Sequence, residues 1–327
     1  MESFGNVFYK PAEPQSWNGR NDGDLSEFQR WHQIVEFINL DKEVPALEFH
    51  HVFLGFCCDE GVKRNQGRVG AKDAPNTMRK ILAGLPNHLP PLRVIADAGD
   101  VICISDDMEA AQNELSKRVL QILERGGLPI VLGGGHEVTY AHFNGLKTFS
   151  NAKKIAVINL DAHLDLRMLK DNQGTSGTGF YQIFEDAKNG GYEVEYLAIG
   201  VQDISNTKAL FNYASDHGVD IIKANEINSL NLDRIIKQIR EFSAKVDHIY
   251  VTVDMDFFAS SFAPGVSSPA FNGVVPDSIF MSLFETILML PELRSIDFAE
   301  INPLFDIDNR TTKLASDLIF RLVNNTR

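Results

Sequence analysis

From about residue 50 onward, short apolar runs alternate with longer stretches whose apolar residues recur at helical spacing. Short runs rich in β-branched residues are typical of buried strands. Eight such runs stand at His50–Phe56, Arg93–Ala96, Pro129–Leu132, Lys154–Leu160, Glu195–Ile199, Val219–Ile222, His248–Val253 and Arg294–Phe298. Met108–Arg125 has one apolar face and is followed by Gly126, which predicts a helix and its end. A last helix is predicted over Thr312–Val323, with Thr312 as its N-cap.

This alternation of strands and helices indicates an α/β fold. Its expected core is a mainly parallel sheet of about eight strands, with helices on both faces. No linker rich in Pro, Gly or Ser divides the series, so residues 1–327 are interpreted as a single domain. Residues 1–46 are more polar and aromatic. We expect them to form an N-terminal arm packed on that domain, with a short helix near Leu25–Ile38.

The composition narrows the class of partner. The chain has 327 residues and a formal net charge of −13. Phosphate binding needs clustered Lys and Arg, so nucleic acid and anionic membranes are not expected partners. The three cysteines, Cys57, Cys58 and Cys103, form neither a CxxC motif nor a disulfide framework, which favours a reducing cytoplasm. No signal-peptide stretch is seen, and no apolar run approaches the ~20 residues that span a bilayer.

Acidic and histidine residues follow three of the predicted strands directly. The motif DAHLD (Asp161–Asp165) comes after one strand, DMD (Asp254–Asp256) after another, and GGGHE (Gly133–Glu137) after a third. In open α/β sheets, sites form at the carboxyl ends of strands. If the first two motifs stay extended, their alternate side chains share one side and converge. The glycines of the third would allow a tight turn that brings His136 close to the others.

Together these motifs supply four carboxylates and two imidazoles. Clustered carboxylates repel one another unless cations are bound among them. Oxygen and nitrogen ligands without thiolate suit Mn²⁺ best, with Mg²⁺, Fe²⁺, Co²⁺ and Zn²⁺ as competitors. Two bridging carboxylates would hold two ions about 3.5–4 Å apart, an arrangement that generates a hydroxide nucleophile. Each motif alone could instead be a capped or tight turn. The glycines lack the Gly-Lys-Ser/Thr sequence of a phosphate loop.

The three motifs resemble the metal motifs of the ureohydrolase (arginase/agmatinase) superfamily. DAGD (Asp97–Asp100) and EINP (Glu300–Pro303) resemble further elements of that family, so the likeness runs from about residue 50 to the end. It implies an arginase-like three-layer α/β/α sandwich, two Mn²⁺ per subunit and a homo-oligomer. Carried over by position, it implies one ion on His136, Asp161, Asp165 and Asp254, and another on Asp161, His163, Asp254 and Asp256. Asp161 and Asp254 would bridge the two ions.

Several stretches outside the metal motifs resemble formimidoylglutamases, which hydrolyse N-formimidoyl-L-glutamate to L-glutamate and formamide in histidine degradation. The main ones are residues 17–20, 30–33, 61–71 and 263–267. The loop Gly174–Gly179 lacks the histidine that arginases carry after DAHxD, and Phe257–Ser260 replaces the usual Gly-Leu-Asp-Pro. Both departures favour formimidoylglutamase over arginase. Agmatinase or another guanidino hydrolase that releases urea is the alternative activity, and a catalytically silent binding protein is the non-enzymatic one.

Two carboxylates are expected to act in catalysis. Asp165 is the candidate to move a proton to the leaving nitrogen. Glu300 would accept hydrogen bonds from the amidine-like head, or else stabilise a turn. The two substrate carboxylates call for cationic or NH-donating groups, although each arginine could instead form a structural ion pair. The candidates are Arg64, Asn65, Arg68, Arg167, Ser176 and Thr178. His142, Trp17 and Trp31 are predicted to be structural.

Overall fold

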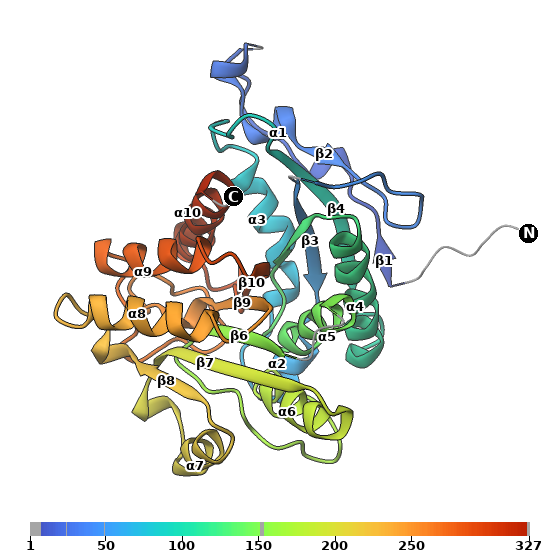
Figure 1. The fold of residues 1–327 in the computed structure, drawn as a ribbon. Helices are drawn as coiled ribbons and strands as arrows, with labels where there is room; N and C mark the ends of the chain where they lie inside the picture. Colours follow the sequence, from blue (N-terminus) through green and yellow to red (C-terminus); the bar gives the residue numbers. More distant parts are fainter. Residues whose placement is uncertain (1–7, 24, 49, 151–153, 326–327) are drawn as a thin grey trace, which may run out of the picture.

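The computed structural model describes residues 8–23, 25–48, 50–150 and 154–325. A sheet crosses the molecule, with helices packed on both of its faces (Figure 1). The strands are β1 (Tyr9–Lys10), β2 (Glu36–Phe37), β3 (His50–Cys57), β4 (Val94–Ile102), β5 (Leu128–Leu132), β6 (Lys154–Leu160), β7 (Glu193–Val201), β8 (Asp220–Lys223), β9 (His248–Asp254) and β10 (Leu293–Ala299). The α-helices are α1 (Trp31–Ile34), α2 (Glu60–Arg64), α3 (Ala74–Leu82), α4 (Met108–Glu124), α5 (Val138–Ser150), α6 (Gly179–Gly190), α7 (Lys208–Asp216), α8 (Leu232–Ser243), α9 (Ser278–Leu288) and α10 (Arg310–Asn325).

The strand order is β1-β4-β3-β5-β10-β9-β6-β7-β8, and β2 also pairs with β4. Only β1 runs antiparallel to its neighbour among the described strands. Each of the eight predicted strands is present, and β6 has the predicted bounds. The sequence did not indicate β1 and β2, which are two residues long and lie at one side of the sheet. The predicted mainly parallel α/β fold is confirmed.

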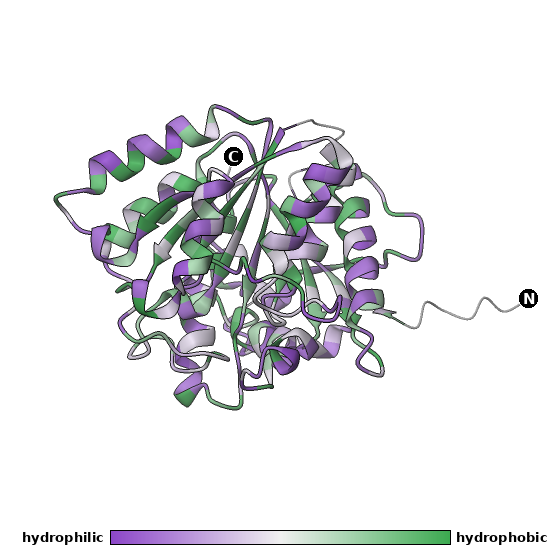
Figure 2. Cartoon of the chain, turned by 90° about the horizontal axis from the view of Figure 1, so that it is seen from below, coloured by the Kyte–Doolittle hydropathy of each residue, from purple (hydrophilic) through white to green (hydrophobic). Residues whose placement is uncertain are grey.

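Each face of the sheet has its own apolar core. Phe53, Ile130 and Ile158 pack in one core with residues of α3, α8, α9 and α10. Their sequence neighbours on the strands, such as Val52 and Val131, pack in the other core with residues of α4, α5 and α6. Successive strand residues point to opposite faces, so a sheet covered on both sides needs near-continuous apolar strands. Figure 2 shows the hydrophobic strands between helices of mixed polarity.

The N-terminal segment differs from the expected helix over Leu25–Ile38, which is wrong in extent. A 3₁₀ turn, η2 (Ser26–Phe28), and the four-residue α1 are followed by β2. The reason lies in the tertiary contacts of the backbone: Trp31 N donates to Leu85 O at 2.9 Å, and His32 N donates to Ala83 O at 3.2 Å. These bonds hold the segment against the end of α3, where a longer helix would have to give them up.

Both tryptophans of this segment are packing residues, as predicted. The Trp17 indole donates to the Asp97 carboxylate at 2.6 Å. The fully buried Trp31 packs between Phe53 and Phe320, with ring centroids 6.0 and 5.9 Å away. These contacts connect the N-terminal segment to β4, β3 and α10.

The last helix begins earlier than predicted, and its cap is a different residue. Helix α10 starts at Arg310, so Thr312 lies inside its first turn. The Asp306 carboxylate accepts from Thr311 N at 2.8 Å, Thr312 N at 2.9 Å and Thr312 Oγ1 at 2.7 Å. The predicted Thr312 cap is therefore wrong. A carboxylate satisfies the free N–H groups of a helix start and interacts well with its dipole.

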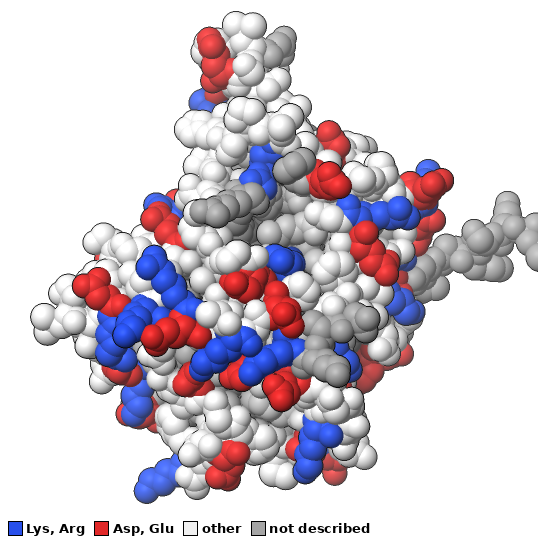
Figure 3. Space-filling view, in the orientation of Figure 1, with Lys and Arg blue, Asp and Glu red and all other residues white. Residues whose placement is uncertain are grey.

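Two features of the described structure bear on the predictions about membrane and nucleic-acid partners. In the part of the chain that the structure describes, no helix is both long and apolar enough to cross a bilayer. Figure 3 shows Lys and Arg side chains interspersed with Asp and Glu over the face that it displays. Charges of both signs on that face do not form the single-sign field that phosphate backbones need.

Candidate metal centre

Four neighbouring strands deliver the candidate site. In the sheet, β5, β10, β9 and β6 lie next to one another and run parallel. GGGHE follows β5, Glu300 follows β10, DMD begins at the last residue of β9, and DAHLD follows β6. The carboxyl ends of parallel strands meet at one edge, which is where open α/β sheets place their sites.

The GGGHE turn depends on its glycines. Gly133 and Gly134 have φ values of 73° and 80°, in the left-handed region that side chains disfavour. Gly133 N donates to Phe298 O at 2.9 Å, and Gly135 N donates to Cys58 O at 3.0 Å. The turn therefore closes against β10 and the segment after β3, and it places the His136 imidazole in the interior.

The other two motifs do not continue as extended strands, contrary to expectation. After β6 the chain bends at Ala162 and His163, and Asp165 takes a φ of 47°. After β9 the chain forms a 3₁₀ turn, η6 (Met255–Phe257). In each motif the first aspartate accepts a bond from the backbone N two residues later, at 2.7 Å for His163 N and 2.8 Å for Asp256 N. Alternate side chains of an extended strand stand about 7 Å apart, so the turn is what closes them on one point.

The six predicted ligand side chains come together in two groups that share Asp161. One group is His136, Asp161, Asp165 and Asp254, and the other is Asp161, His163 and Asp256, with the ligand atoms of each group within 4.8 Å of one another. His136 Nδ1 lies 2.8 Å from Asp165 Oδ2 and 3.3 Å from both Asp161 Oδ2 and Asp254 Oδ2. His163 Nδ1 lies 3.0 Å from Asp256 Oδ2. Asp254 belongs to the first group only, so its bridging of two ions stays a prediction.

The cluster carries an excess of buried negative charge. Burial and the neighbouring Asp256 charge raise the pKa of Asp254 well above its usual range. Burial also raises the pKa of Asp256, to about 6. Burial of Asp161 opposes its ionisation, but hydrogen bonds with His136 and His163 outweigh that cost and lower its pKa. Two imidazoles are too few for four aspartates, and cations bound among them would relieve the repulsion.

Unsatisfied atoms provide a separate test of fit to a cation. Asp256 Oδ1 and Glu300 Oε2 are buried, and neither has a hydrogen-bond partner in the described structure. A buried acceptor without a partner costs about 1–3 kcal/mol, and more if it is charged. Carboxylate oxygens and imidazole nitrogens without thiolate form the donor set that suits Mn²⁺ and similar ions. The residues present therefore fit a pair of divalent cations.

A buried chain of polar groups orients His136, and this chain was not predicted from the sequence. His136 Nε2 lies 3.0 Å from Thr252 Oγ1, and that hydroxyl donates to Asp297 Oδ1 at 2.6 Å. Because the hydroxyl proton goes to Asp297, its oxygen accepts from Nε2–H, which leaves Nδ1 free to bind a cation. The signal was available, since Thr252 lies two residues before Asp254 on β9 and shares its side of the sheet. His142 Nδ1 lies 2.8 Å from Asp297 Oδ2, in keeping with its predicted structural role.

Glu300 lies beside the cluster in an unusual backbone conformation, with a φ of 67°. Its backbone N donates to Gly134 O at 2.9 Å, and its Oε1 accepts from His136 N at 2.7 Å. Burial raises the pKa of Glu300 to about 7. A non-glycine residue held at positive φ is a form of strain often found at functional sites. Asp165, the other predicted catalytic residue, shares this feature.

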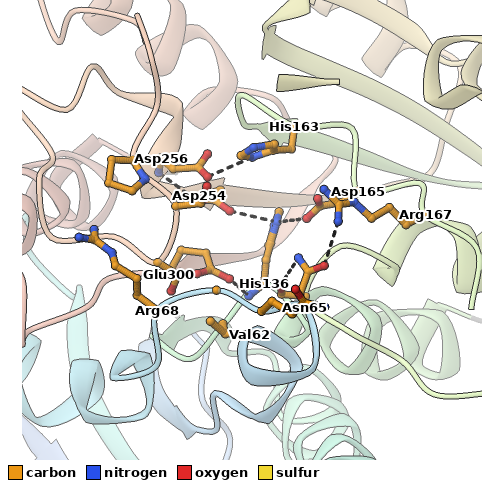
Figure 4. Close-up of a pocket in the computed structure, with 16 residues that line it drawn as sticks. Val62, Asn65, Arg68, His136, His163, Asp165, Arg167, Asp254, Asp256 and Glu300 are labelled. Carbon is orange, nitrogen blue, oxygen red and sulfur yellow. Dashed lines mark hydrogen bonds and ion pairs between the residues drawn. The ribbon is translucent and has the colours of Figure 1, made fainter. Parts of the chain in front are cut away.

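The cluster forms the floor of a pocket of about 380 Å³ (Figure 4). Of the predicted substrate-binding residues, Asn65, Arg68 and Ser176 line it, as does Arg167. Ser267 and Ser268 line the pocket as well, although they were not among the substrate-binding residues predicted from the sequence.

Arg64 and Thr178 are not among the lining residues. The Arg64 guanidinium pairs with Glu109 at 2.6 Å and donates to Gly174 O at 3.2 Å. Thr178 is buried, and its hydroxyl accepts from Thr175 N at 2.9 Å. Both side chains therefore make contacts that support the Gly174–Gly179 loop.

Comparison with known proteins shows the family to which the chain belongs. Residues 49–324 match the family model described as Arginase family. The chain belongs to the arginase family. The formimidoylglutamase of Ralstonia nicotianae is 41% identical over 319 residues, which cover 96% of each chain. That of Geobacillus thermodenitrificans is 39% identical over 310 residues, which cover 94% of each chain.

Solved arginase-family structures share the fold. Trypanosoma cruzi formiminoglutamase, determined with Mn²⁺, superposes with a TM-score of 0.74 and 27% identity, over 84% of this chain and 92% of that chain. The formimidoylglutamase of Bacillus subtilis gives a TM-score of 0.81 at 22% identity, over 93% of each chain. At 22% identity, the similarity to the Bacillus subtilis structure supports the fold only.

Proposed function

We propose that this chain is a binuclear manganese hydrolase that cleaves N-formimidoyl-L-glutamate to L-glutamate and formamide. The observation that carries the proposal is the pocket itself. Its floor holds two groups of potential metal ligands that share Asp161, and its wall carries arginine side chains suited to an anionic substrate. Similarity to formimidoylglutamases along nearly the whole chain supports the same substrate.

The proposed ligands are those of the two groups. His136, Asp161, Asp165 and Asp254 would hold one Mn²⁺, and Asp161, His163, Asp254 and Asp256 would hold the other. When bound, the ions would act as Lewis acids that lower the pKa of a coordinated water towards ~7. The Thr252 hydroxyl keeps the His136 ring in the tautomer that presents Nδ1 to the cluster.

Two side chains of the pocket are proposed to act on the substrate. The Asp165 carboxylate lies at the pocket surface and would carry a proton to the leaving amine. Glu300 Oε2 has no hydrogen-bond partner in the described structure and would accept an N–H of the amidine-like head. Its other oxygen is held by His136 N, so the free oxygen is fixed in place before substrate arrives. Fixed acceptors cost little reorganisation in the transition state.

The proposed substrate-binding residues fall into two sets. Asn65, Arg68 and Ser176 line the pocket and would contact the substrate tail directly. Arg64 and Thr178 would act through the Gly174–Gly179 loop, which they hold by hydrogen bonds.

We also propose the setting of the activity. The reaction would serve histidine degradation in the cytoplasm, where the free state of Cys57, Cys58 and Cys103 would persist. Residues 1–327 would form one arginase-like domain with 1–46 as an arm on it, supported by the Trp17 and Trp31 contacts. The family resemblance favours a homo-oligomer, which light scattering on the purified protein would test.

One assay tests the activity. Purified, Mn²⁺-loaded protein is incubated in parallel with N-formimidoyl-L-glutamate, agmatine and arginine, and the products are analysed by mass spectrometry. We expect formamide and glutamate from the first compound only. Urea from agmatine or arginine, without formamide, would establish the guanidino hydrolase instead. Inactivity on all three would favour a binding protein on this fold.

A further inference from the structure

The tail of a dicarboxylate substrate needs cationic partners of its own in this pocket. Asp165, Asp254, Asp256 and Glu300 line the floor, and the two proposed cations would be neutralised by the carboxylates that hold them, so the tail has to be met by cations on the wall. Two arginines, Arg68 and Arg167, line the pocket. Within the described residues, neither forms an ion pair with a protein carboxylate. Figure 4 shows them on opposite sides of the His136 and Asp254 side chains.

Arg68 is held firmly, but not by a charge. Its Nη2 donates to the Pro264 and Val266 carbonyls, and its guanidinium lies 4.1 Å from the Phe305 ring centroid. The Asn302 amide, two residues after Glu300, donates to Arg68 O at 2.9 Å. The Arg68 Nε is buried and has no hydrogen-bond partner among the described residues, and the bonds to Pro264 and Val266 use Nη2 and not Nη1. A guanidinium fixed in this way at the pocket wall is pre-organised to present Nη1 to a carboxylate.

Arg167 is the opposite case, an exposed arginine at the rim. Its Nη1 donates to Asn65 Oδ1 at 3.1 Å, and Asn65 Nδ2 donates to Ser176 Oγ at 3.0 Å. The Ser176 hydroxyl accepts that bond, so its own proton is available to a substrate oxygen. The three side chains form a row of donors on the wall opposite Arg68.

We propose that Arg68 and Arg167 bind different carboxylates of the substrate, one arginine for each, on opposite walls of the pocket. The inference rests on the proposed function and deepens it, because it assigns the dicarboxylate selectivity to two residues. Arg64 is excluded from this role, since Glu109 and Glu60 already neutralise its guanidinium. Selectivity would arise because a substrate that lacks one carboxylate leaves one arginine unpaired near the site.

The test combines variants with truncated substrates. N-formimidoyl-L-glutamate is compared with N-formimidoyl-L-2-aminobutyrate, which lacks the distal carboxylate, and with 4-(formimidoylamino)butyrate, which lacks the α-carboxylate. For wild type we expect each truncation to lower kcat/KM by about 10- to 100-fold, mainly through KM, as loss of a charged hydrogen bond does. Arg68→Gln and Arg167→Gln are each expected to lower kcat/KM on the full substrate by a similar factor.

The decisive result is the pattern across the two variants. Each variant should become insensitive, within about 3-fold, to removal of one carboxylate, and the two should differ in which carboxylate that is. A purely structural role would leave both truncation penalties intact. Retention of both penalties by either variant, or insensitivity of both variants to the same carboxylate, overturns the inference.

A matched control and the wild type separate the remaining outcomes. Arg234→Gln removes an arginine of α8 that pairs with Glu226 at 2.8 Å, and it should keep both wild-type penalties. Metal content and circular dichroism check that the variants are folded and loaded. Wild type that cleaves no formimidoyl compound overturns the proposed function together with this inference. Wild type that cleaves them without the predicted variant pattern overturns the inference alone.

Discussion

Two of the buried charged clusters among the described residues are built on opposite principles. In one, the Arg79 guanidinium lies 2.6 Å from both Asp97 and Asp100, and Trp17 adds a further donor to Asp97. The fully buried Asp97 carboxylate is thereby matched by one guanidinium, and Asp100, the second carboxylate, is 27% exposed to solvent. In the other, the aspartates of DAHLD and DMD face two imidazoles, and Asp256 Oδ1 has no partner in the described structure.

The difference teaches how to read a buried carboxylate. Asp97 and Asp100 belong to a motif that resembles the family's, as the metal motifs do, yet their partners are protein groups that join α3 and the N-terminal segment to β4. A matched cluster stabilises the fold and has no need of a ligand. An unmatched cluster is costly until something from outside completes it, so the imbalance of charge marks the functional site.

The largest expected effect is on the unmatched cluster. His136→Ala or Asp161→Asn should lower turnover by at least about 10³-fold, because each removes a proposed ligand whose cation would supply several kcal/mol of charge stabilisation. The fold should be largely retained, since these groups gain little from the protein alone. Metal content by mass spectrometry and steady-state kinetics measure both effects. Full activity in either variant would contradict the ligand assignment.

A substitution in the Arg79–Asp97 cluster should lower stability and leave metal binding nearly unchanged. Arg79→Met leaves the Asp97 carboxylate buried without its counter-charge, which costs about 3–5 kcal/mol of unfolding free energy. Mn²⁺ affinity of the folded protein should stay close to that of wild type. Chemical denaturation followed by fluorescence measures the first quantity, and calorimetric titration measures the second.

Arg234→Met provides the control for that variant. It breaks an ion pair with Glu226 in which the arginine side chain is 50% exposed, so the cost should stay below about 1 kcal/mol. An Arg79 variant as stable as this control would mean that Asp97 does not depend on its counter-charge.

A smaller effect on metal affinity is expected from a residue that orients a metal ligand but does not itself bind the cation. Thr252→Val removes the hydroxyl that accepts from His136 Nε2 while it keeps the shape of the side chain. Groups that orient a metal ligand typically contribute 10- to 100-fold in metal affinity. We expect a loss in that range in a competition titration with a chelator, and Thr252→Ser should restore most of it. Equal affinity in the Val and Ser variants would argue that the hydroxyl does not orient the ring.

The smallest effect is a pH dependence of the metal-free protein. Burial and the Glu300 charge raise the pKa of Glu137 to about 8, and burial raises that of Glu300 to about 7. The native state therefore holds more protons than the unfolded state near neutral pH, and stability falls as pH rises. The buried His51, with a pKa lowered to about 3, gives the opposite slope only below about 6.5.

We therefore expect the Tm of the metal-free protein to fall by about 2 °C or more between pH 6.5 and 8, the shift that about 1 kcal/mol produces in a large chain. Added Mn²⁺ should raise the Tm more at pH 8 than at pH 6.5, because protons compete with cations for ligand carboxylates such as Asp254 and Asp256, whose pKa values burial raises. Differential scanning fluorimetry with and without chelator measures both slopes. A Tm that rises with pH in the metal-free protein would contradict the raised pKa values of Glu137 and Glu300.

Much of the fold could be predicted because β3 to β10 are nearly continuous apolar runs, and a sheet buried on both faces leaves them little alternative. The arm could not be predicted equally well. Its backbone donors at Trp31 and His32 bond to carbonyls at Leu85 and Ala83, far along the chain. Local pattern carries no information about such partners, and for this reason the helix predicted at Leu25–Ile38 was too long.

The sequence by itself determined which residues lie at the carboxyl edge of the sheet, because each metal motif directly follows an apolar strand. Only the tertiary structure decided how those residues meet. The turns at His163 and Met255, the left-handed backbone of Asp165 and the Thr252 contact depend on neighbours from other strands. It also separated Arg64 from Arg68, four residues apart. Long side chains take the partners they can reach, and Glu109 reaches only one of these arginines.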